Sequence, residues 1–273
     1  MKPAISQVCT LHSPFDKDVE DYAAGACHAI EIWLGKLETF LDGHSTDDVR
    51  RLLEAKGMAA PVAAYQGGLM TEHPDARREH WEHFARRLAL CRELGVGTLV
   101  IACDVAGPLS QQLLDRVQES LVQAAQRAEA AGVRLALEFR ASAAFANNLQ
   151  TAAALAAEVG SPHLGLCLDV FEYYLGPSKP EDLRYLNSEN LFHVQLSDLA
   201  GTPRELAADA DRILPGDGDF DLEPILSALR AINYQGYVSL ELMNPQIWRI
   251  PPRQLGEVGM TAMRKVLGQA SME

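Results

Sequence analysis

The chain has 273 residues, of which 48% are hydrophobic and 22% are charged, and its formal net charge is −13. This length and composition can supply a sizeable core for one α/β domain of about 250 residues. Because phosphate groups are bound mainly by Lys and Arg, the acidic balance argues against nucleic acid and anionic membranes as partners.

The N-terminus and the cysteines indicate a reducing compartment. The first residues lack the basic and then apolar layout of a signal peptide, and no run approaches the roughly eighteen apolar residues of a membrane span. The five cysteines are scattered and form no CxxC pair, so neither a disulfide framework nor a zinc finger is predicted. We therefore expect a cytoplasmic protein.

Strand-like apolar runs alternate with helix-like segments along the whole chain. The predicted strands are 5–11, 29–33, 58–66, 98–103, 133–139, 164–169, 191–196 and 237–241. The predicted helices are 16–26, a segment capped by Ser45 or Thr46 that runs to Lys56, 74–93, 110–131, 149–159, 180–186, 222–232 and 252–267. Strands that are apolar throughout are typical of a parallel sheet covered by helices. Eight such units predict a single (β/α)8 TIM barrel domain over residues 1–273.

The main alternative architecture is a dinucleotide-binding doubly wound sheet. That fold should carry G-x-G-x-x-G after the first strand, whereas this chain has SPFDKD there. The chain also lacks a Walker P-loop, a G-x-S-x-G elbow and a HExxH helix. These absences favour the closed barrel.

Four successive predicted strands end on a side chain that carries oxygen: Glu138, Asp169, Gln195 and Glu241. Functional side chains of such barrels lie at the C-terminal ends of the strands, so we expect these four to converge. Three carboxylates at one point would repel each other and take up protons unless a cation compensates them. Three carboxylates and an amide oxygen form a hard ligand set, which favours Mn²⁺ or Mg²⁺.

Several stretches of the chain match motifs of a known family. These are AIEIWLGK (29–36), LEFR (137–140), FANNLQTA (145–152), CLDVFEYY (167–174), FHVQLSD (192–198), RILPGDGDFDL (212–222) and INYQGYVSLELMNP (232–245). On these motifs the sequence resembles the xylose isomerase-like barrels of the sugar isomerase and epimerase superfamily over nearly its whole length. The last two stretches resemble the inosose isomerase branch in particular.

The resemblance implies a divalent metal held by Glu138, Asp169, Gln195 and Glu241, with Mn²⁺ favoured and Mg²⁺, Co²⁺ or Zn²⁺ as alternatives. On strand seven, His193 and Gln195 share one face because they are two residues apart. The second position is the family's ligand, so we expect His193 one layer below as a supporting or substrate-side residue. Relatives are often dimers or tetramers, so a homo-oligomer is one expectation.

The chemistry that the resemblance implies is isomerisation or epimerisation of a keto-sugar or keto-inositol. A proton would move through a metal-bound enediolate, with Glu138 and Glu241 as the acid–base pair. Arg212 matches a substrate-facing arginine of the family. Other residues that could line the pocket are Trp33, Lys36, His12 and Gln66.

Two positions depart from the family pattern. Close relatives usually carry His where this chain has Arg140 and Glu172. Each change replaces an imidazole that titrates near neutral pH with a group of fixed charge. Because the two charges are opposite, we expect Arg140 and Glu172 to form an ion pair at the mouth of the pocket. The pair would alter the family's usual proton relay or the choice of substrate.

Two further readings stay open. One is a metal-dependent lyase on the same scaffold, acting on an inosose, a dehydroshikimate or a 3-keto-glycoside and expelling a leaving group. The other is a catalytically silent barrel that binds a sugar or a partner protein. Product mass separates isomerase from dehydratase, and metal content separates both from the silent barrel.

Overall fold

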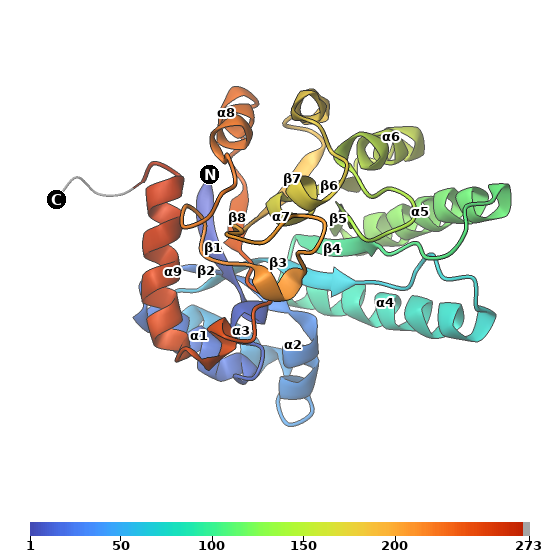
Figure 1. Cartoon of the computed structure of the whole chain (residues 1–273). Coiled ribbons are helices and arrows are strands. Elements are labelled where there is room, and N and C mark those ends of the chain that lie inside the picture. Colours follow the sequence, from blue (N-terminus) through green and yellow to red (C-terminus); the bar gives the residue numbers. More distant parts are fainter. Residues whose placement is uncertain (270–273) are drawn as a thin grey trace.

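Eight parallel strands pair in chain order, and the eighth closes onto the first to complete a barrel. This computed structural model describes residues 1–269 (Figure 1). The strands are β1 (Lys2–Ser6), β2 (Ala29–Trp33), β3 (Ala59–Gln66), β4 (Thr98–Cys103), β5 (Arg134–Phe139), β6 (Leu164–Asp169), β7 (Leu191–Leu196) and β8 (Tyr237–Leu240). The predicted (β/α)8 TIM barrel is confirmed.

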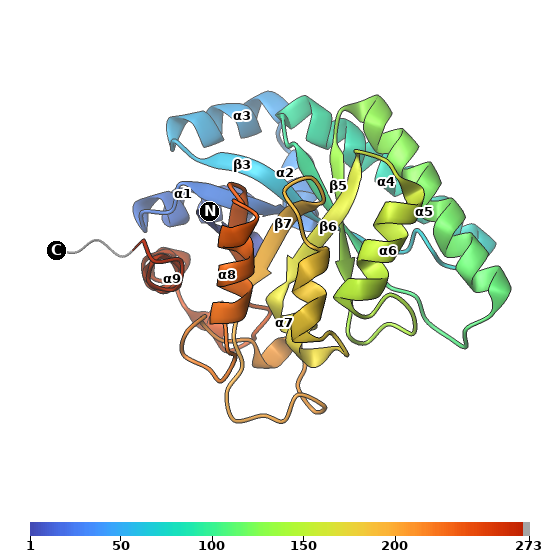
Figure 2. The same ribbon diagram turned by 90° about the horizontal axis from the view of Figure 1, so that it is seen from above.

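Helices lie around the strands, as the view from above shows (Figure 2). They are α1 (Phe15–Ala24), α2 (Leu34–Leu41), α3 (Thr46–Ala55), α4 (Pro74–Leu94), α5 (Gln111–Ala131), α6 (Leu149–Val159), α7 (Val170–Leu175), α8 (Glu223–Ala231) and α9 (Pro252–Val266). Four short 3-10 segments interrupt the loops: η1 (Gln7–Thr10), η2 (Pro180–Tyr185), η3 (Asp209–Asp211) and η4 (Ile247–Arg249). Helix α9 packs against α1 and β1, so it covers the seam where the barrel closes.

Capping residues set the ends of several helices. Ser110 and Asn148 accept hydrogen bonds from backbone N–H groups in the first turns of α5 and α6. Gly132 and Gly160 end the same two helices in the left-handed conformation that favours glycine. These signals explain why the predicted bounds of α5 and α6 agree with the structure to within one residue.

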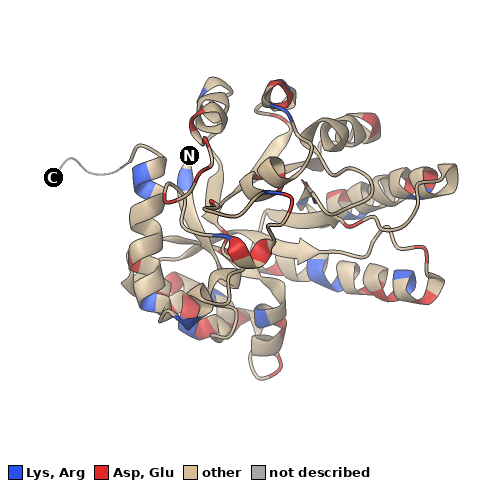
Figure 3. Cartoon of the chain, in the orientation of Figure 1, with Lys and Arg blue, Asp and Glu red and all other residues tan. Residues whose placement is uncertain are grey.

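The strands are buried because they face the helices on one side and the barrel interior on the other. An interior layer consists of Val62, Ala64, Val100, Ala136, Cys167 and Phe192, and Trp33 packs against it. Charged residues lie mainly on the helices and loops, whereas the strand ribbons carry few of them (Figure 3). Among residues 1–269, no helix is long and apolar enough to cross a membrane.

The structure corrects three local predictions. The run predicted as strand 5–11 leaves the sheet after Ser6 and continues as η1. Helices α2 and α7 were not predicted; each starts directly at the end of a strand with no loop to mark it. The predicted helix 180–186 is instead the 3-10 segment η2.

Candidate functional site

The four side chains expected to converge lie at the C-terminal ends of four neighbouring strands. Glu138, Asp169 and Gln195 belong to β5, β6 and β7, and Glu241 follows the last residue of β8. All four are buried. The Gln195 amide nitrogen donates a hydrogen bond to Glu241 over 2.8 Å, and Asp169 lies beside Gln195 in the sheet register. The structure therefore brings the four residues to one end of the barrel.

A candidate cation site lies among these acids, and it includes one residue that was not expected there. Glu138, Asp169 and Glu172 each place one carboxylate oxygen within 4.8 Å of the others. Glu172 comes from α7, whose first turn follows β6 directly. It was predicted as a substrate-side residue, and the structure places its carboxylate among the candidate ligands.

Gln195 bridges two carboxylates instead of presenting its oxygen to them. Its nitrogen donates to Glu31 at 2.9 Å as well as to Glu241, and its oxygen accepts a hydrogen bond from the Cys167 thiol at 3.1 Å. In this orientation the amide nitrogen faces the acids, so Gln195 offers no oxygen to an ion. Its role as a metal ligand stays a prediction.

Arg212 is fully buried among the same acids, although it comes from the long β7–α8 loop. Its guanidinium donates to both oxygens of Asp169, at 2.7 and 3.2 Å, and to Glu241 at 3.1 Å. It also donates to Asp209 at 3.0 Å and lies over the ring of Phe171. A buried arginine of this kind neutralises part of the acidic charge and fixes the orientation of the carboxylates.

Arg140 contacts three carboxylates from three different segments. Its Nε lies 3.0 Å from Glu172, and its two terminal nitrogens lie 3.5 Å from Glu138 and 3.2 Å from Asp209. The ion pair predicted between Arg140 and Glu172 is therefore confirmed by distance. Its Nε–H is not aligned with Glu172 as a hydrogen bond, so the attraction there is mainly between charges.

Acidic groups outnumber basic ones in this cluster, where five carboxylates contact two arginines and a sixth, Glu31, pairs with His193. Burial raises the pKa of Glu138 to about 8, although the charge of Arg140 opposes the shift. Burial likewise raises the pKa of Glu241 well above its ordinary value and raises the pKa of Glu172. Without a cation, part of the cluster therefore holds protons at neutral pH.

Two acids of the cluster were not among the predicted site residues. Glu31 on β2 lies 2.6 Å from His193 Nε2 and also accepts a hydrogen bond from Ser6. Burial favours the neutral form of Glu31, but His193 outweighs this and the pKa of Glu31 is lowered. Asp209, which binds both arginines, lies in a loop whose polar sequence gave no signal. Glu31 could have been found, because it lies on an inward-facing strand position.

His193 lies in the barrel interior below Gln195, as expected from their spacing. It is fully buried, and its Nε2 faces Glu31. This pairing makes His193 a support for Glu31, which in turn accepts a hydrogen bond from Gln195. A direct role for His193 with substrate stays a prediction.

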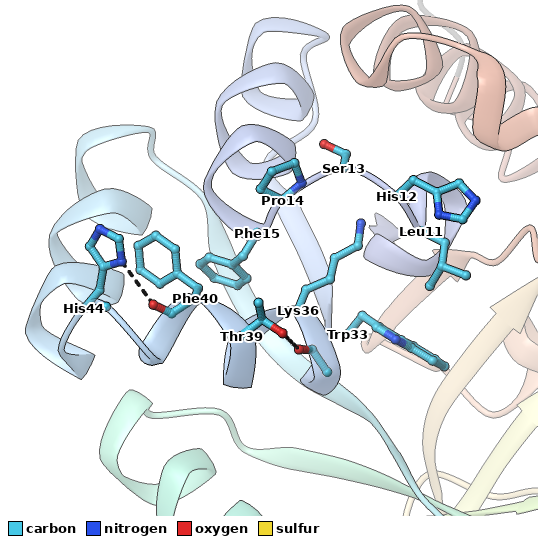
Figure 4. Close-up of a pocket in the computed structure, with 12 residues that line it drawn as sticks. Leu11, His12, Ser13, Pro14, Phe15, Trp33, Lys36, Thr39, Phe40 and His44 are labelled. Atoms are coloured by element: carbon cyan, nitrogen blue, oxygen red, sulfur yellow. Dashed lines mark hydrogen bonds between the residues drawn. The ribbon is translucent and has the colours of Figure 1, made fainter.

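The four expected pocket-lining residues lie apart from the acids. Lys36 is buried, and its ammonium binds the backbone oxygens of Gln7 and Thr10 and the carboxylate of Asp18. His12 and Trp33 line a cavity of about 660 Å³ beside α2 (Figure 4). Gln66 lines a neighbouring cavity of about 330 Å³. Within residues 1–269, none of the four donates a hydrogen bond to the acidic cluster.

The loop that carries Asp209 and Arg212 is held at its base by one buried carboxylate, Asp198. This side chain accepts hydrogen bonds from the backbone N–H groups of Leu199, Gly216, Gly218 and Phe220. A Cβ at Gly218 would lie 2.2 Å from the Asp198 carboxylate, so only glycine permits this approach. The backbones of Asp198 and Ile213 also pair as a short antiparallel bridge. Arg212, next in the chain to Ile213, is placed by this framework.

Known proteins match this chain over most of its length. The family model described as xylose isomerase-like TIM barrel matches residues 20–266. An inosose isomerase of Bacillus velezensis is 28% identical over 258 residues, which cover 92% of this chain and 91% of the relative. A 3-dehydroshikimate dehydratase of Pseudomonas aeruginosa is 29% identical over 96% of this chain, but the match covers only 41% of that protein.

Solved structures show the same fold. A crystal structure of the IOLI protein with a bound zinc atom superposes with a TM-score of 0.92 at 24% identity and covers 100% of both chains. A D-psicose 3-epimerase from Clostridium cellulolyticum H10, solved with D-tagatose, gives a TM-score of 0.77 at 19% identity over 98% of this chain and 99% of that chain.

Proposed function

Because the chain belongs to the xylose isomerase-like TIM barrel family, we propose that it is a metal-dependent isomerase or epimerase of a keto-sugar or keto-inositol. The observation that carries the proposal is the buried acidic cluster at the C-terminal ends of β5 to β8. The names of the relatives support it, since inosose isomerases match over almost the whole chain.

The residues that would hold a divalent ion are Glu138, Asp169 and Glu241, with Glu172 as a further candidate. Gln195 would join them only after its amide turned its oxygen toward the acids. Their fit rests on charge: the acids exceed the neighbouring arginines, and burial raises the pKa of Glu138 and Glu241. Oxygen-rich sets of this kind suit Mn²⁺ or Mg²⁺, whereas the similar IOLI structure holds zinc. When bound, such an ion would polarise a substrate carbonyl and acidify the adjacent C–H.

The chain's own residues would move the proton. Glu138 and Glu241 extend from non-adjacent strands, so a substrate held between them would present a different face to each. A carboxylate beside the reacting carbon can accept a proton and return it to the neighbouring carbon. Arg212 would orient Asp169 and Glu241 and offset negative charge that develops on an enediolate.

The test is a screen of keto-sugars and inososes with added Mn²⁺, read by mass spectrometry and by NMR in D₂O. An isomerase conserves the mass of its substrate apart from deuterium taken up at the reacting carbon. Turnover that is abolished by a chelator and restored by metal supports the proposal. A protein that retains no metal and converts no substrate would instead be a silent barrel.

The second candidate is a lyase, and one observation favours it. The dehydratase of P. aeruginosa matches this chain as closely in identity as the isomerases do. A dehydratase would use the same acid–base pair and release a product lighter by one water. The same screen therefore separates the two activities.

Other expectations from the sequence stay predictions of this proposal. A cytoplasmic location can be checked by cell fractionation, and a homo-oligomer by light scattering. Limited proteolysis would check that residues 1–273 behave as one domain.

A further inference from the structure

A cavity outside the acidic cluster lies between the segment after β1 and helix α2. Its volume is about 660 Å³, and Figure 4 shows Trp33 at one side with Phe15 and Phe40 at the other. Phe15 and Phe40 lie 5.3 Å apart, and the ring of His44 stacks on Phe40 at 4.0 Å. Leu11 and Pro14 complete the apolar wall.

Two polar side chains around this cavity already have partners, whereas the buried hydroxyl of Ser13 has none among the described residues. The ammonium of Lys36 is bound by Gln7, Thr10 and Asp18, and the hydroxyl of Thr39 donates to the backbone oxygen of Gly35. A polyol placed here would lose hydrogen bonds with water and regain few from the protein. The lining therefore suits a flat apolar group, because aromatic walls pack well on ring systems.

A chain of cavities that share lining residues lies between this cavity and Arg140. Trp33 and Gly35 also line the second cavity, of about 330 Å³. Tyr65 and Asp104 are common to that cavity and to a third, of about 480 Å³, which reaches Arg140. Arg140 in turn contacts the proposed acid–base residue Glu138. All these walls lie at the C-terminal ends of strands, as the proposed active site does.

We propose that the substrate carries a ring-shaped apolar substituent that lies in the cavity between Trp33 and Phe40, while its polyol ring lies at the acidic cluster. This inference rests on the proposed function and narrows its substrate class to sugars or cyclitols with an apolar substituent. The volume of the first cavity alone lies within the range of small-molecule sites. An unsubstituted polyol bound at the acidic cluster would leave this cavity unoccupied.

The test compares phenyl β-D-glucopyranoside with methyl β-D-glucopyranoside as binding probes for the full-length protein. Dissociation constants come from calorimetry, and saturation-transfer NMR identifies the protons that contact protein. We expect the phenyl glycoside to bind about tenfold or more tightly, because the ring buries apolar area. Its ring protons should show the strongest saturation.

Two glycine substitutions locate the binding. Gly35 and Gly43 both line the cavity, and a Cβ at either meets no atom closer than 3.6 Å. Gly35→Leu and Gly43→Leu should therefore fill the cavity without a clash and remove the phenyl preference. Gly97→Leu is the matched control, because Gly97 precedes β4 at the opposite end of the barrel and its Cβ also meets nothing within 4 Å.

The outcomes separate this inference from the proposed function. Equal affinity for the two glycosides overturns the inference, whatever the substrate screen shows. A phenyl preference that survives both cavity substitutions also overturns it, because the ring then binds elsewhere. A phenyl preference lost in both variants and kept in Gly97→Leu supports the apolar site, even if the screen assigns a lyase instead of an isomerase.

Discussion

Two buried charged groups lie at the same end of this barrel and differ in balance. Beside α1 and α2, Asp18 and Lys36 form a pair at 2.6 Å, and Thr10 donates to Asp18 at 2.8 Å. One acid pairs with one base, and hydrogen bonds from Thr10 and to Gln7 satisfy the remaining polar atoms of the pair. At the ends of β5 to β8, five carboxylates instead share two cations, Arg140 and Arg212.

This difference in charge balance distinguishes a pair that stabilises the fold, Asp18 with Lys36, from the acidic cluster that we propose as the active site. A balanced buried pair needs nothing from outside, and removing one partner leaves an uncompensated charge. An acidic excess must take up protons or a cation, and sites with this property are where chemistry is expected. Lys36, predicted as a pocket residue, does line the cavity beside α2, but its ammonium is bound within the balanced pair.

The largest effect should follow from removing a proposed acid–base group. Glu241→Gln keeps the shape of the side chain but cannot carry the proton, so turnover should fall about a thousandfold. The measurement is the rate by NMR on whichever substrate the screen identifies. The urea midpoint serves as the control and should not fall. Unchanged turnover would remove Glu241 from the mechanism.

Breaking the balanced pair should act on stability instead. Lys36→Met leaves Asp18 buried without its cation, and the free energy of unfolding should fall by about 3–5 kcal/mol. Urea denaturation followed by circular dichroism measures the loss. The double variant Asp18→Asn with Lys36→Met should recover part of it. If Lys36→Met abolished substrate binding at full stability, Lys36 would belong to the site after all.

The acidic excess predicts how stability depends on pH. The pKa of Glu138 is about 8 in the folded protein against an ordinary value of 4.5. The folded chain thus holds more protons between these values, and the free energy of unfolding falls as pH rises from about 4.5 to about 8. Thermal melts in EDTA should show this fall, and Mn²⁺ should raise Tm by about 5 °C more at pH 8 than at pH 5.

The control for this dependence is Glu138→Gln, which should flatten the slope in EDTA. Asp18, whose pKa burial raises to about 6, titrates within the same range and would remain in that variant. An equal gain in Tm from Mn²⁺ at both pH values would contradict a cation at the acidic cluster.

The smallest effect should come from changing the geometry of a charge while keeping its sign. Arg140→Lys cannot contact Glu138, Glu172 and Asp209 together, because an ammonium lacks the fork of a guanidinium. We expect kcat/KM to fall about tenfold with little change in stability. Arg184→Lys, at an exposed position away from the cluster, is the matched control. An unchanged kcat/KM would mean that the charge of Arg140 suffices.

The fold could be predicted closely because strands and helix caps leave local signals. The predicted bounds of β4, β6 and β7 agree with the structure, since each run is apolar and has a clear end. Helices α2 and α7 were missed because they continue from a strand without a glycine or proline to separate them. Asp169 ends β6 and also accepts a hydrogen bond from Phe171 in α7, so one residue serves both elements.

The site could be predicted where its residues lie on or next to strands or within a recognised motif. Glu138, Asp169, Gln195 and Glu241 were found from their position, and the pairing of Arg140 with Glu172 from opposite charges. Asp209 could not be found, because its place depends on how the β7–α8 loop folds over the barrel. The orientation of Gln195 depends on Glu31 and Cys167, which approach it only in the closed barrel.

The anchoring of the β7–α8 loop by Asp198 has a consequence for how this scaffold can change. Asp198 and the N–H groups of Gly216, Gly218 and Phe220 tie the base of the loop together. Residues 202–207 take no part in that anchor, whereas Gly201 donates to Asp219 and Ala208 donates to Asp211 at the two ends of the segment. The sequence of this segment can therefore change without moving Arg212. New side chains in the segment would then contact different substrates.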